Sequence, residues 1–213
     1  MKHFVVIAGN IAAGKTTLTK LLSQQLDWEP FLESVADNPY LADFYQDMHR
    51  WSFHSQIFFL SRRLVHHRQL LARPNSVVQD RSVYEDAEIF ARNLSLQESM
   101  SQRDYGVYRE LYEAIVSILP PPDLVIYLRA SVPSLLFRIN QRGRDFEQNI
   151  DPGYLTQLNR LYEDWISSFT LCPVLTVPTD TLNYAENPAH LELVIGKILD
   201  KLHGKEVVEF SAP

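Results

Sequence analysis

A glycine-rich segment near the start of the chain has the residue types and spacing of a phosphate-binding loop. Residues 9–16 read GNIAAGKT and satisfy the pattern G-x-x-x-x-G-K-[ST] between an apolar run and a helical pattern, a context that a chance glycine turn would lack. In such a loop, backbone N–H groups and the helix N-terminus hold the β-phosphate, the lysine reaches the β and γ oxygens, and the hydroxyl ligates Mg²⁺. The residues predicted to bind the phosphates of ATP are Gly9, Asn10, Ile11, Ala12, Ala13, Gly14, Lys15, Thr16 and Thr17. Lys15 is also predicted to be catalytic and Thr16 to bind the metal.

The loop motif leaves the phosphate acceptor open, because GTPases, ATPases and many kinases share it. A second pair of charged residues, Asp80 and Arg81, follows another apolar run. The carboxyl ends of strands are where open α/β sheets bind ligands, so this pair is a candidate for positioning Mg²⁺ and the reacting groups. The alternative is a structural ion pair at the end of a strand.

Three arginines close together predict a cationic lid at about 138–150. Arg138 and Arg142 are four residues apart and therefore share one face of a helix. Gly143 can end that helix in the left-handed conformation, so that Arg144 projects from the segment that follows. In an acidic protein, this cluster favours a lid over phosphates, and a solvated basic face is the alternative.

Further segments, taken with the glycine motif, carry a family resemblance. The chain has ESV at 33–35 leading to NPYL at 38–41, Tyr45, WSFHSQ at 51–56 with Arg63, DRSVYEDAEIFA at 80–91, and RINQRGRDFE at 138–147. In this order they resemble the deoxyribonucleoside kinases, the family that contains deoxycytidine, deoxyguanosine and bacterial deoxyadenosine kinases. The resemblance covers nearly the whole chain and implies a P-loop kinase fold.

The resemblance implies a role for each matching residue at the reacting centre. Glu33 would be the general base that takes the proton of the 5′-hydroxyl, Arg81 would hold that carboxylate and the reacting oxygens, and Asp80 would help to position Mg²⁺. Arg138, Arg142 and Arg144 would clamp the phosphates or face the donor base, Arg138 and Arg142 as catalytic groups. Glu147 and Tyr45 would bind the sugar 3′-hydroxyl.

The position of the general base has one competitor. The family's base motif usually reads Glu-Pro-Val, whereas this chain has Ser34 after Glu33, and Glu29-Pro30 stands four residues earlier. Glu33 lies at the family's distance from Asn38, so the register favours it over Glu29.

The base-reading residues are predicted from helical spacing together with the resemblance. Gln56 and Arg63 are seven residues apart, so a helix returns them to nearly the same azimuth, while Arg62 points away. By resemblance, Gln56 reads the edge of the nucleobase, and Arg63 with Asp86 marks members that accept deoxycytidine and purine deoxynucleosides. A buried Arg63–Asp86 salt bridge with no ligand role is the alternative. The aromatic residues of this helix, Trp51, Phe53, Phe58 and Phe59, are for the most part more typical of a core, and lining of the base pocket by any of them is the alternative.

The elements that must position these residues follow from short aliphatic runs that alternate with helical stretches. Strands are predicted at 4–8, 76–79, 124–128 and 174–177, and with a weaker pattern at 29–32, which indicates an α/β fold with a parallel sheet of about five strands. Two long helices are expected at 51–73 and 104–119. Helix starts are predicted at Asn38, Ser131, Asp151 and Asn187, each followed by proline within two residues. A frayed tail is expected at 204–213.

Composition sets limits on partners and location. The 213 residues are 46% apolar and 22% charged, which suits one globular domain, and the net charge of −6 argues against a surface that binds a nucleic-acid polymer or an anionic membrane. The lone Cys172 rules out an intramolecular disulfide and fits a reduced, cytoplasmic setting. The N-terminal apolar run is too short for a signal peptide. By resemblance, the protein is expected to form a homodimer through its two long helices.

These observations predict an enzyme that uses Mg-ATP to phosphorylate the 5′-hydroxyl of a deoxyribonucleoside, such as deoxyadenosine, deoxyguanosine or deoxycytidine. One alternative is a thymidylate or other nucleoside monophosphate kinase, whose ionised acceptor needs cations rather than the carboxylate that a hydroxyl acceptor uses. A second alternative is a non-catalytic member of the fold that serves as a subunit of a larger assembly. The residues leave open which deoxynucleoside is preferred, whether ATP or another triphosphate is the donor, and whether the deoxynucleoside triphosphate end product inhibits the enzyme.

Overall fold

The computed structural model describes residues 2–32, 37–144, 147, 150–204 and 210. Within them, five strands form one parallel sheet in the order β2-β3-β1-β4-β5, which confirms the predicted α/β fold. The strands are β1 (Phe4–Gly9), β2 (Glu29–Phe31), β3 (Val77–Asp80), β4 (Leu124–Arg129) and β5 (Val174–Pro178). Each predicted strand is present, with ends that differ by at most one residue.

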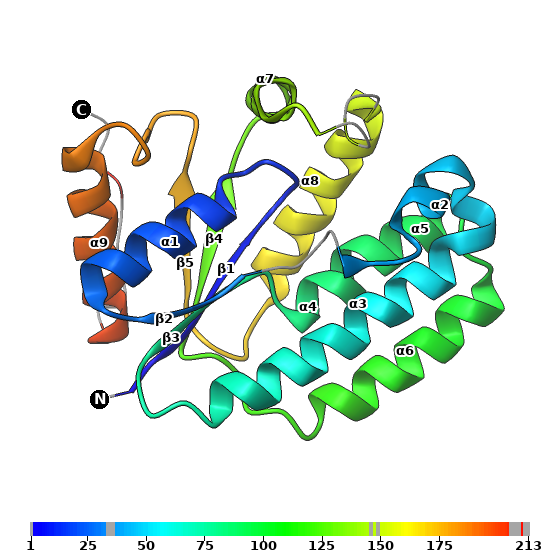
Figure 1. Cartoon of the computed structure of the whole chain (residues 1–213), viewed down its shortest axis with the longest axis horizontal. Coiled ribbons are helices and arrows are strands. Elements are labelled where there is room, and N and C mark those ends of the chain that lie inside the picture. The colour runs from blue at the N-terminus through cyan, green and yellow to red at the C-terminus, as the bar shows by residue number, and fades with distance from the viewer. Residues whose placement is uncertain (1, 33–36, 145–146, 148–149, 205–209, 211–213) are drawn as a thin grey trace.

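Helices connect the strands and cover both faces of the sheet (Figure 1). They are α1 (Lys15–Leu26), α2 (Leu41–Gln46), α3 (Met48–Leu71), α4 (Val83–Glu85), the π-helical segment η2 (Asp86–Ala91), α5 (Arg92–Leu96), α6 (Gln102–Val116), α7 (Val132–Arg142), α8 (Pro152–Ser168) and α9 (Pro188–Leu202). Over the described part of the chain, no helix has both the length and the hydropathy needed to cross a membrane.

The central strand β1 is buried along its whole length because helices pack on both of its faces. Its side chains alternate, so that Val6 joins a core with α3 and α8 while Ile7 joins a second core with α1, α7 and α9. Ile7 also pairs with Asp80 of β3 across the sheet. This register places the end of β1, where the glycine loop begins, beside the end of β3, where the Asp80–Arg81 pair lies.

The predicted helix starts are present in three of four places. The side chains of Ser131, Asp151 and Asn187 accept backbone hydrogen bonds at the starts of α7, α8 and α9. Helix α2 begins at Leu41 instead of directly after Asn38, because the Asn38 side chain accepts a hydrogen bond from the N–H of Tyr40 and makes a turn before the helix. The two long helices α3 and α6 pack against each other.

Candidate functional site

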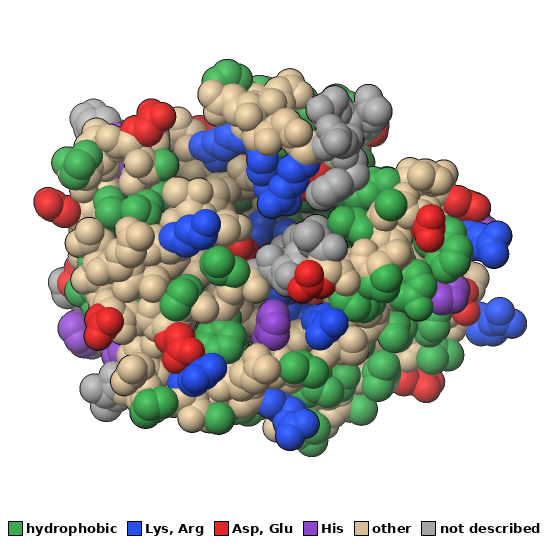
Figure 2. Space-filling view, in the orientation of Figure 1, with side chains coloured by type: hydrophobic (Ala, Val, Ile, Leu, Met, Phe, Trp, Pro, Cys, Tyr) green, Lys and Arg blue, Asp and Glu red, His purple; other side chains and the backbone are tan. Residues whose placement is uncertain are grey.

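A cavity opens at the carboxyl ends of the parallel strands, where open α/β sheets bind ligands. Its lining residues come from the glycine loop, α2, α3, the β3–η2 segment, the end of α7 and α8. They are Ile11, Ala12, Lys15, Thr16, Leu41, Phe44, Tyr45, Gln56, Phe59, Asp80, Arg81, Asp86, Phe90, Arg142, Arg144, Glu147 and Tyr154. Figure 2 shows Lys and Arg side chains gathered around a hollow in the middle of this face.

The glycine loop lies between β1 and α1, as the motif predicts. Gly14 stands directly before α1 with a φ of 104°, and a Cβ there would lie 2.5 Å from the Tyr184 hydroxyl oxygen, so only glycine fits. The Lys15 ammonium donates hydrogen bonds to the carbonyls of Gly9 and Asn10, both at 2.9 Å. Thr17 is exposed and does not line the cavity.

The Asn10 side chain fastens this loop to the rest of the domain. It donates to the carbonyl of Leu155 at 3.1 Å and to the side chain of Asn159 at 2.8 Å, and Asn159 in turn donates to the carbonyl of Ala130. The loop is therefore braced against α8 and the end of β4. The first N–H groups of a helix have no intrahelical partner, so those at the start of α1 are suited to bind an anion.

Thr16 and Asp80 meet at one end of the cavity, where their hydroxyl and carboxylate oxygens are 2.5 Å apart. Asp80 is only 1% exposed, and its Oδ1 atom has no hydrogen-bond partner among the described residues. A buried carboxylate oxygen without a donor, next to a hydroxyl, suits a hard cation such as Mg²⁺ that also binds substrate phosphates. The two residues thus fit the predicted metal site.

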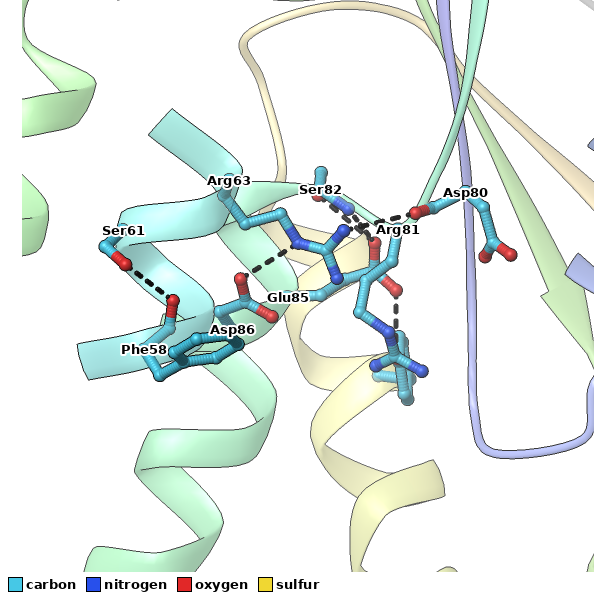
Figure 3. Close-up of polar contacts among 9 residues, drawn as sticks. Phe58, Ser61, Arg63, Asp80, Arg81, Ser82, Glu85 and Asp86 are labelled. Carbon is cyan, nitrogen blue, oxygen red and sulfur yellow. Dashed lines mark hydrogen bonds and ion pairs between the residues drawn. The ribbon is translucent and has the colours of Figure 1, made fainter. Parts of the chain in front are cut away.

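Arg81 is held in an uncommon backbone conformation. Its φ is 68°, which non-glycine residues rarely adopt, and its side chain is buried. The guanidinium carbon lies 4.3 Å from the centre of the Phe90 ring, and Nη1 donates to the Tyr162 hydroxyl at 3.3 Å. Arg81 is one of the residues that line the cavity, and Figure 3 shows its side chain extending away from Asp80.

The three lid arginines have different partners. Gly143 ends α7 with a φ of 63°, as predicted, and Arg142 and Arg144 both contact the buried carboxylate of Glu147 in the cavity lining. Arg138 does not line the cavity: it donates to the carbonyl of Ala13 at 3.3 Å and to two oxygens of Thr179 at 3.1 and 2.7 Å. The shared helix face was predicted correctly, but Arg138 holds the back of the glycine loop while Arg142 faces the cavity.

Gln56 and Asp86 are two buried polar residues that also line the cavity. Gln56 is buried, and its Oε1 has no hydrogen-bond partner among the described residues. Asp86 accepts from Arg63 Nε at 3.1 Å, and Arg63 Nη1 donates to the carbonyl of Asp80 at 3.3 Å (Figure 3). Arg63 shares the buried side of α3 with Gln56, as predicted, and Arg62 is exposed.

Arg63 itself is not among the residues that line the cavity, whereas its ion-pair partner Asp86 is. The buried Arg63–Asp86 salt bridge is therefore present. The expectation that Arg63 faces the nucleobase stays a prediction.

Two tyrosines line the cavity near Glu147. Burial raises the pKa of Tyr45 well above its usual value, and it raises the pKa of Tyr154 to about 12. Both phenols therefore stay protonated at neutral pH and can donate hydrogen bonds to a ligand. Tyr45 and Glu147 were both predicted to bind the sugar, and they line the same cavity.

Several lining residues were missed by sequence reasoning. Phe44 and Tyr154 belong to none of the quoted segments, and Leu41 and Phe90 stand in the segments 38–41 and 80–91 without a predicted role of their own. The placement of all four depends on packing between distant segments. Phe59 lines the cavity, and its position three residues after Gln56 on the same helix was the available signal. Its neighbours Trp51, Phe53 and Phe58 stay out of the lining.

The predicted base Glu33 lies outside the described residues. Its competitor Glu29 is placed: it begins β2, at the opposite end of the strand from the cavity, and its carboxylate lies 3.0 Å from Arg73 Nε. Glu29 is therefore engaged in a surface ion pair away from the site.

Known proteins resemble this chain in sequence and fold. Residues 5–203 match the deoxynucleoside kinase family. The chain is 38% identical to the deoxyadenosine/deoxycytidine kinase of Bacillus subtilis over 204 residues, covering 95% of this chain and 94% of that protein. It is 34% identical to the deoxyadenosine kinase of Lactobacillus acidophilus over 211 residues, covering 95% and 97% of the two chains.

A solved structure has the same architecture. The deoxyadenosine kinase of M. mycoides with bound dATP superposes with a TM-score of 0.82 at 30% identity, covering 92% of this chain and 99% of that one. The match is therefore far longer than any single motif. The chain belongs to the deoxynucleoside kinase family.

Proposed function

We propose that this protein transfers the γ-phosphate of ATP to the 5′-hydroxyl of a deoxyribonucleoside. The observation that carries the proposal is one cavity whose lining includes both a phosphate-binding loop and a buried amide and carboxylate. The loop supplies Lys15 and Thr16, and the buried amide and carboxylate are those of Gln56 and Asp86. A nucleoside between them would present its 5′-oxygen to the donor phosphate, which is the alignment that phosphoryl transfer requires.

The residues at the centre have complementary tasks in this proposal. Lys15 would leave its loop carbonyls to bind the β and γ oxygens, and Thr16 and Asp80 would hold Mg²⁺. When bound there, Mg²⁺ supplies charge neutralisation at the transferring phosphate. Arg81 and Arg142 would stabilise the charge that spreads over the equatorial oxygens, and Glu33 would accept the proton of the 5′-hydroxyl.

At the sugar end, the proposal assigns Tyr45 and Glu147 to the 3′-hydroxyl. The Tyr45 phenol can donate a hydrogen bond and the Glu147 carboxylate can accept one, so together they match a hydroxyl, which does both. Arg142 and Arg144 contact the same carboxylate, so these two arginines and the proposed sugar site have Glu147 in common.

The base end favours a nucleobase with an exocyclic amine. Asp86 can only accept when ionised, so it matches the amine of adenine or cytosine, whereas thymine offers a carbonyl at that position and adds a methyl group. The relatives named as deoxyadenosine, deoxyguanosine and deoxycytidine kinases fit this preference. Arg63 orients Asp86 through the ion pair between them.

A substrate panel tests the proposal. Purified protein with Mg-ATP is offered deoxyadenosine, deoxyguanosine, deoxycytidine and thymidine, with thymidine monophosphate as the control for a monophosphate kinase, and product formation is followed by chromatography. We expect phosphorylation of at least one amine-bearing deoxynucleoside, with thymidine much slower. Activity confined to thymidine monophosphate, or none at all while Mg-ATP binds, would contradict the proposal.

We also infer that the protein acts in the cytoplasm as a homodimer of single-domain subunits spanning residues 1–213. The paired helices α3 and α6 expose apolar side chains, among them Val65, Val107 and Leu111, which are 44%, 53% and 43% exposed. A second copy would bury such side chains. Light scattering in solution tests the dimer: a mass of one subunit across the accessible concentration range would rule it out.

A further inference from the structure

Glu85 is a fully buried carboxylate that the proposed mechanism does not use. It is the last residue of the short helix α4, which begins three residues after the end of β3. It does not line the cavity. Its Oε1 accepts from the N–H of Gly9 at 3.1 Å and lies 2.9 Å from the Tyr162 hydroxyl. Its Oε2 accepts from the N–H of Ser82 at 2.8 Å and from the Ser82 hydroxyl at 3.1 Å.

Both oxygens of Glu85 therefore face hydrogen-bond donors. A carboxylate satisfies this arrangement because it accepts at both oxygens, whereas an amide of the same shape would place its NH₂ group against a donor on one side or the other. A buried charge also costs free energy unless it is hydrogen-bonded, and this one has partners on each oxygen. The surroundings of Glu85 thus specify a carboxylate rather than a polar group in general.

The partners of Glu85 are the two parts of the site that must be aligned. Gly9 begins the phosphate-binding loop, and Ser82 directly follows Arg81, whose left-handed backbone needs a fixed neighbour. Glu85 reaches both, although Gly9 and Glu85 are 76 residues apart in the sequence. Figure 3 shows Ser82, Glu85 and Arg81 converging at the end of β3.

Tyr162 of α8 completes the link. Its hydroxyl lies 2.8 Å from the Gly9 carbonyl, the same carbonyl that accepts from Lys15, and receives a hydrogen bond from Arg81. Burial raises the pKa of Tyr162 far above its usual value, so the phenol keeps its proton and shares it between Glu85 and Gly9. One hydrogen-bond network therefore joins the loop that holds the donor phosphates to the arginine at the reacting centre.

We propose that Glu85, acting through Tyr162 and Ser82, is a positioning residue that sets the placement of Arg81 relative to the phosphate-binding loop. It touches neither substrate in this arrangement. Its effect is on the alignment of the γ-phosphate with the attacking oxygen, where a misplacement of about 1 Å costs about 100-fold in rate. The inference rests on the proposed function, because that function gives Arg81 its part in phosphoryl transfer.

The first test is Glu85→Gln, measured with the best deoxynucleoside of the panel. We expect kcat to fall about 10- to 100-fold with little change in KM for the deoxynucleoside, and Mg-ATP binding by calorimetry to weaken. The matched control is Glu88→Gln, since Glu88 lies three residues further on, pairs with Arg109 at 2.6 Å and does not line the cavity. A Glu85→Gln enzyme that keeps its wild-type kcat per folded molecule, even with a lower unfolding midpoint, overturns the inference.

A second variant covers the case in which Glu85→Gln does not fold. Tyr162→Phe removes only the bridging hydroxyl, and we expect a smaller fall in kcat; an unchanged kcat would count against the network. Where both variants fold, the kcat of the double variant should fall no further than that of the more impaired single variant, because both residues act through one network. If the two reductions in kcat multiply instead, the inference is overturned. If the wild type phosphorylates nothing in the panel, the proposed function fails separately, and an unchanged Mg-ATP affinity in Glu85→Gln then rejects the link to the loop.

Discussion

The carboxylates that follow one another at the end of β3 have different neighbours, and these neighbours suit each one to a different task. Asp80 has a hydroxyl beside it and an oxygen without a donor among the described residues, which favours a cation. Asp86 pairs with the guanidinium of Arg63 and lines the cavity. Glu85 is surrounded by donors from the protein itself. The residue type is similar in all three, so the task is defined by the surroundings.

The general base gives a prediction at single-residue scale. Glu33→Gln should lower kcat by roughly 10²–10⁴ with little change in Mg-ATP binding, since the acceptor hydroxyl would lose the group that takes its proton. Glu29→Gln is the matched control and should be nearly silent, because Glu29 pairs with Arg73 on the surface. Steady-state kinetics of both variants show which glutamate is the general base. An unchanged kcat in Glu33→Gln together with a reduced kcat in Glu29→Gln would reverse the assignment.

The Arg63–Asp86 pair gives a second prediction at this scale. The double substitution Arg63→Met with Asp86→Ala removes the acceptor for an exocyclic amine and enlarges the base end, so kcat/KM for thymidine should rise relative to deoxyadenosine. Each single substitution should raise the kcat/KM for thymidine less than the double substitution does, because it leaves one member of the buried Arg63–Asp86 ion pair without the other. Ratios of kcat/KM on folded protein test this, and a wild-type ratio in the double variant would show that Asp86 does not read the base.

At the scale of elements, the sequence predicts best what neighbouring residues determine. The glycine loop between β1 and α1, the caps of α7, α8 and α9, and the end of α7 at Gly143 follow from local patterns. What a helix face contacts across the molecule is not local. Arg138 and Arg142 share a face, yet one holds Thr179 and the other Glu147, and the bond between Gly9 and Glu85 joins segments with no pattern in common.

The different partners of the lid arginines make a prediction for helix α7. Arg142→Ala should lower kcat strongly, by about 10³-fold or more if it contacts the transferring phosphate, with little change in the unfolding midpoint, because Arg142 lies at the cavity and is partly exposed. Arg138→Ala should instead raise the KM for ATP and lower the midpoint, since it removes hydrogen bonds to Ala13 and Thr179. Steady-state kinetics and thermal unfolding of both variants test this difference. If the two variants change kcat, KM and the unfolding midpoint in the same way, the prediction is wrong.

At the scale of the whole molecule, α3 is joined to β1 through a buried histidine. His67 packs edge-on against Phe4 with ring centres 5.2 Å apart, and its Nε2 has no hydrogen-bond partner among the described residues. Burial lowers the pKa of His67, an effect that a contact with the backbone of Pro120 partly offsets. The neutral ring therefore belongs to the folded state, and it lies between the sheet and the long helix that supplies Gln56 to the site.

This arrangement predicts how stability depends on pH. Above the unfolded-state pKa, about 6.5, His67 is neutral in both states, and as the pH falls below that value the unfolded chain binds the proton first, so the free energy of unfolding decreases until the lower folded pKa is reached. His67→Gln removes this titration, and urea unfolding at pH 7.5 and 5.5 should show a smaller loss of stability on acidification than in the wild type. His49→Gln, an exposed histidine on the same helix, is the control and should keep the wild-type difference. An equal loss in the His67 variant and the wild type would show that protonation at this position does not contribute to the acid sensitivity of the fold.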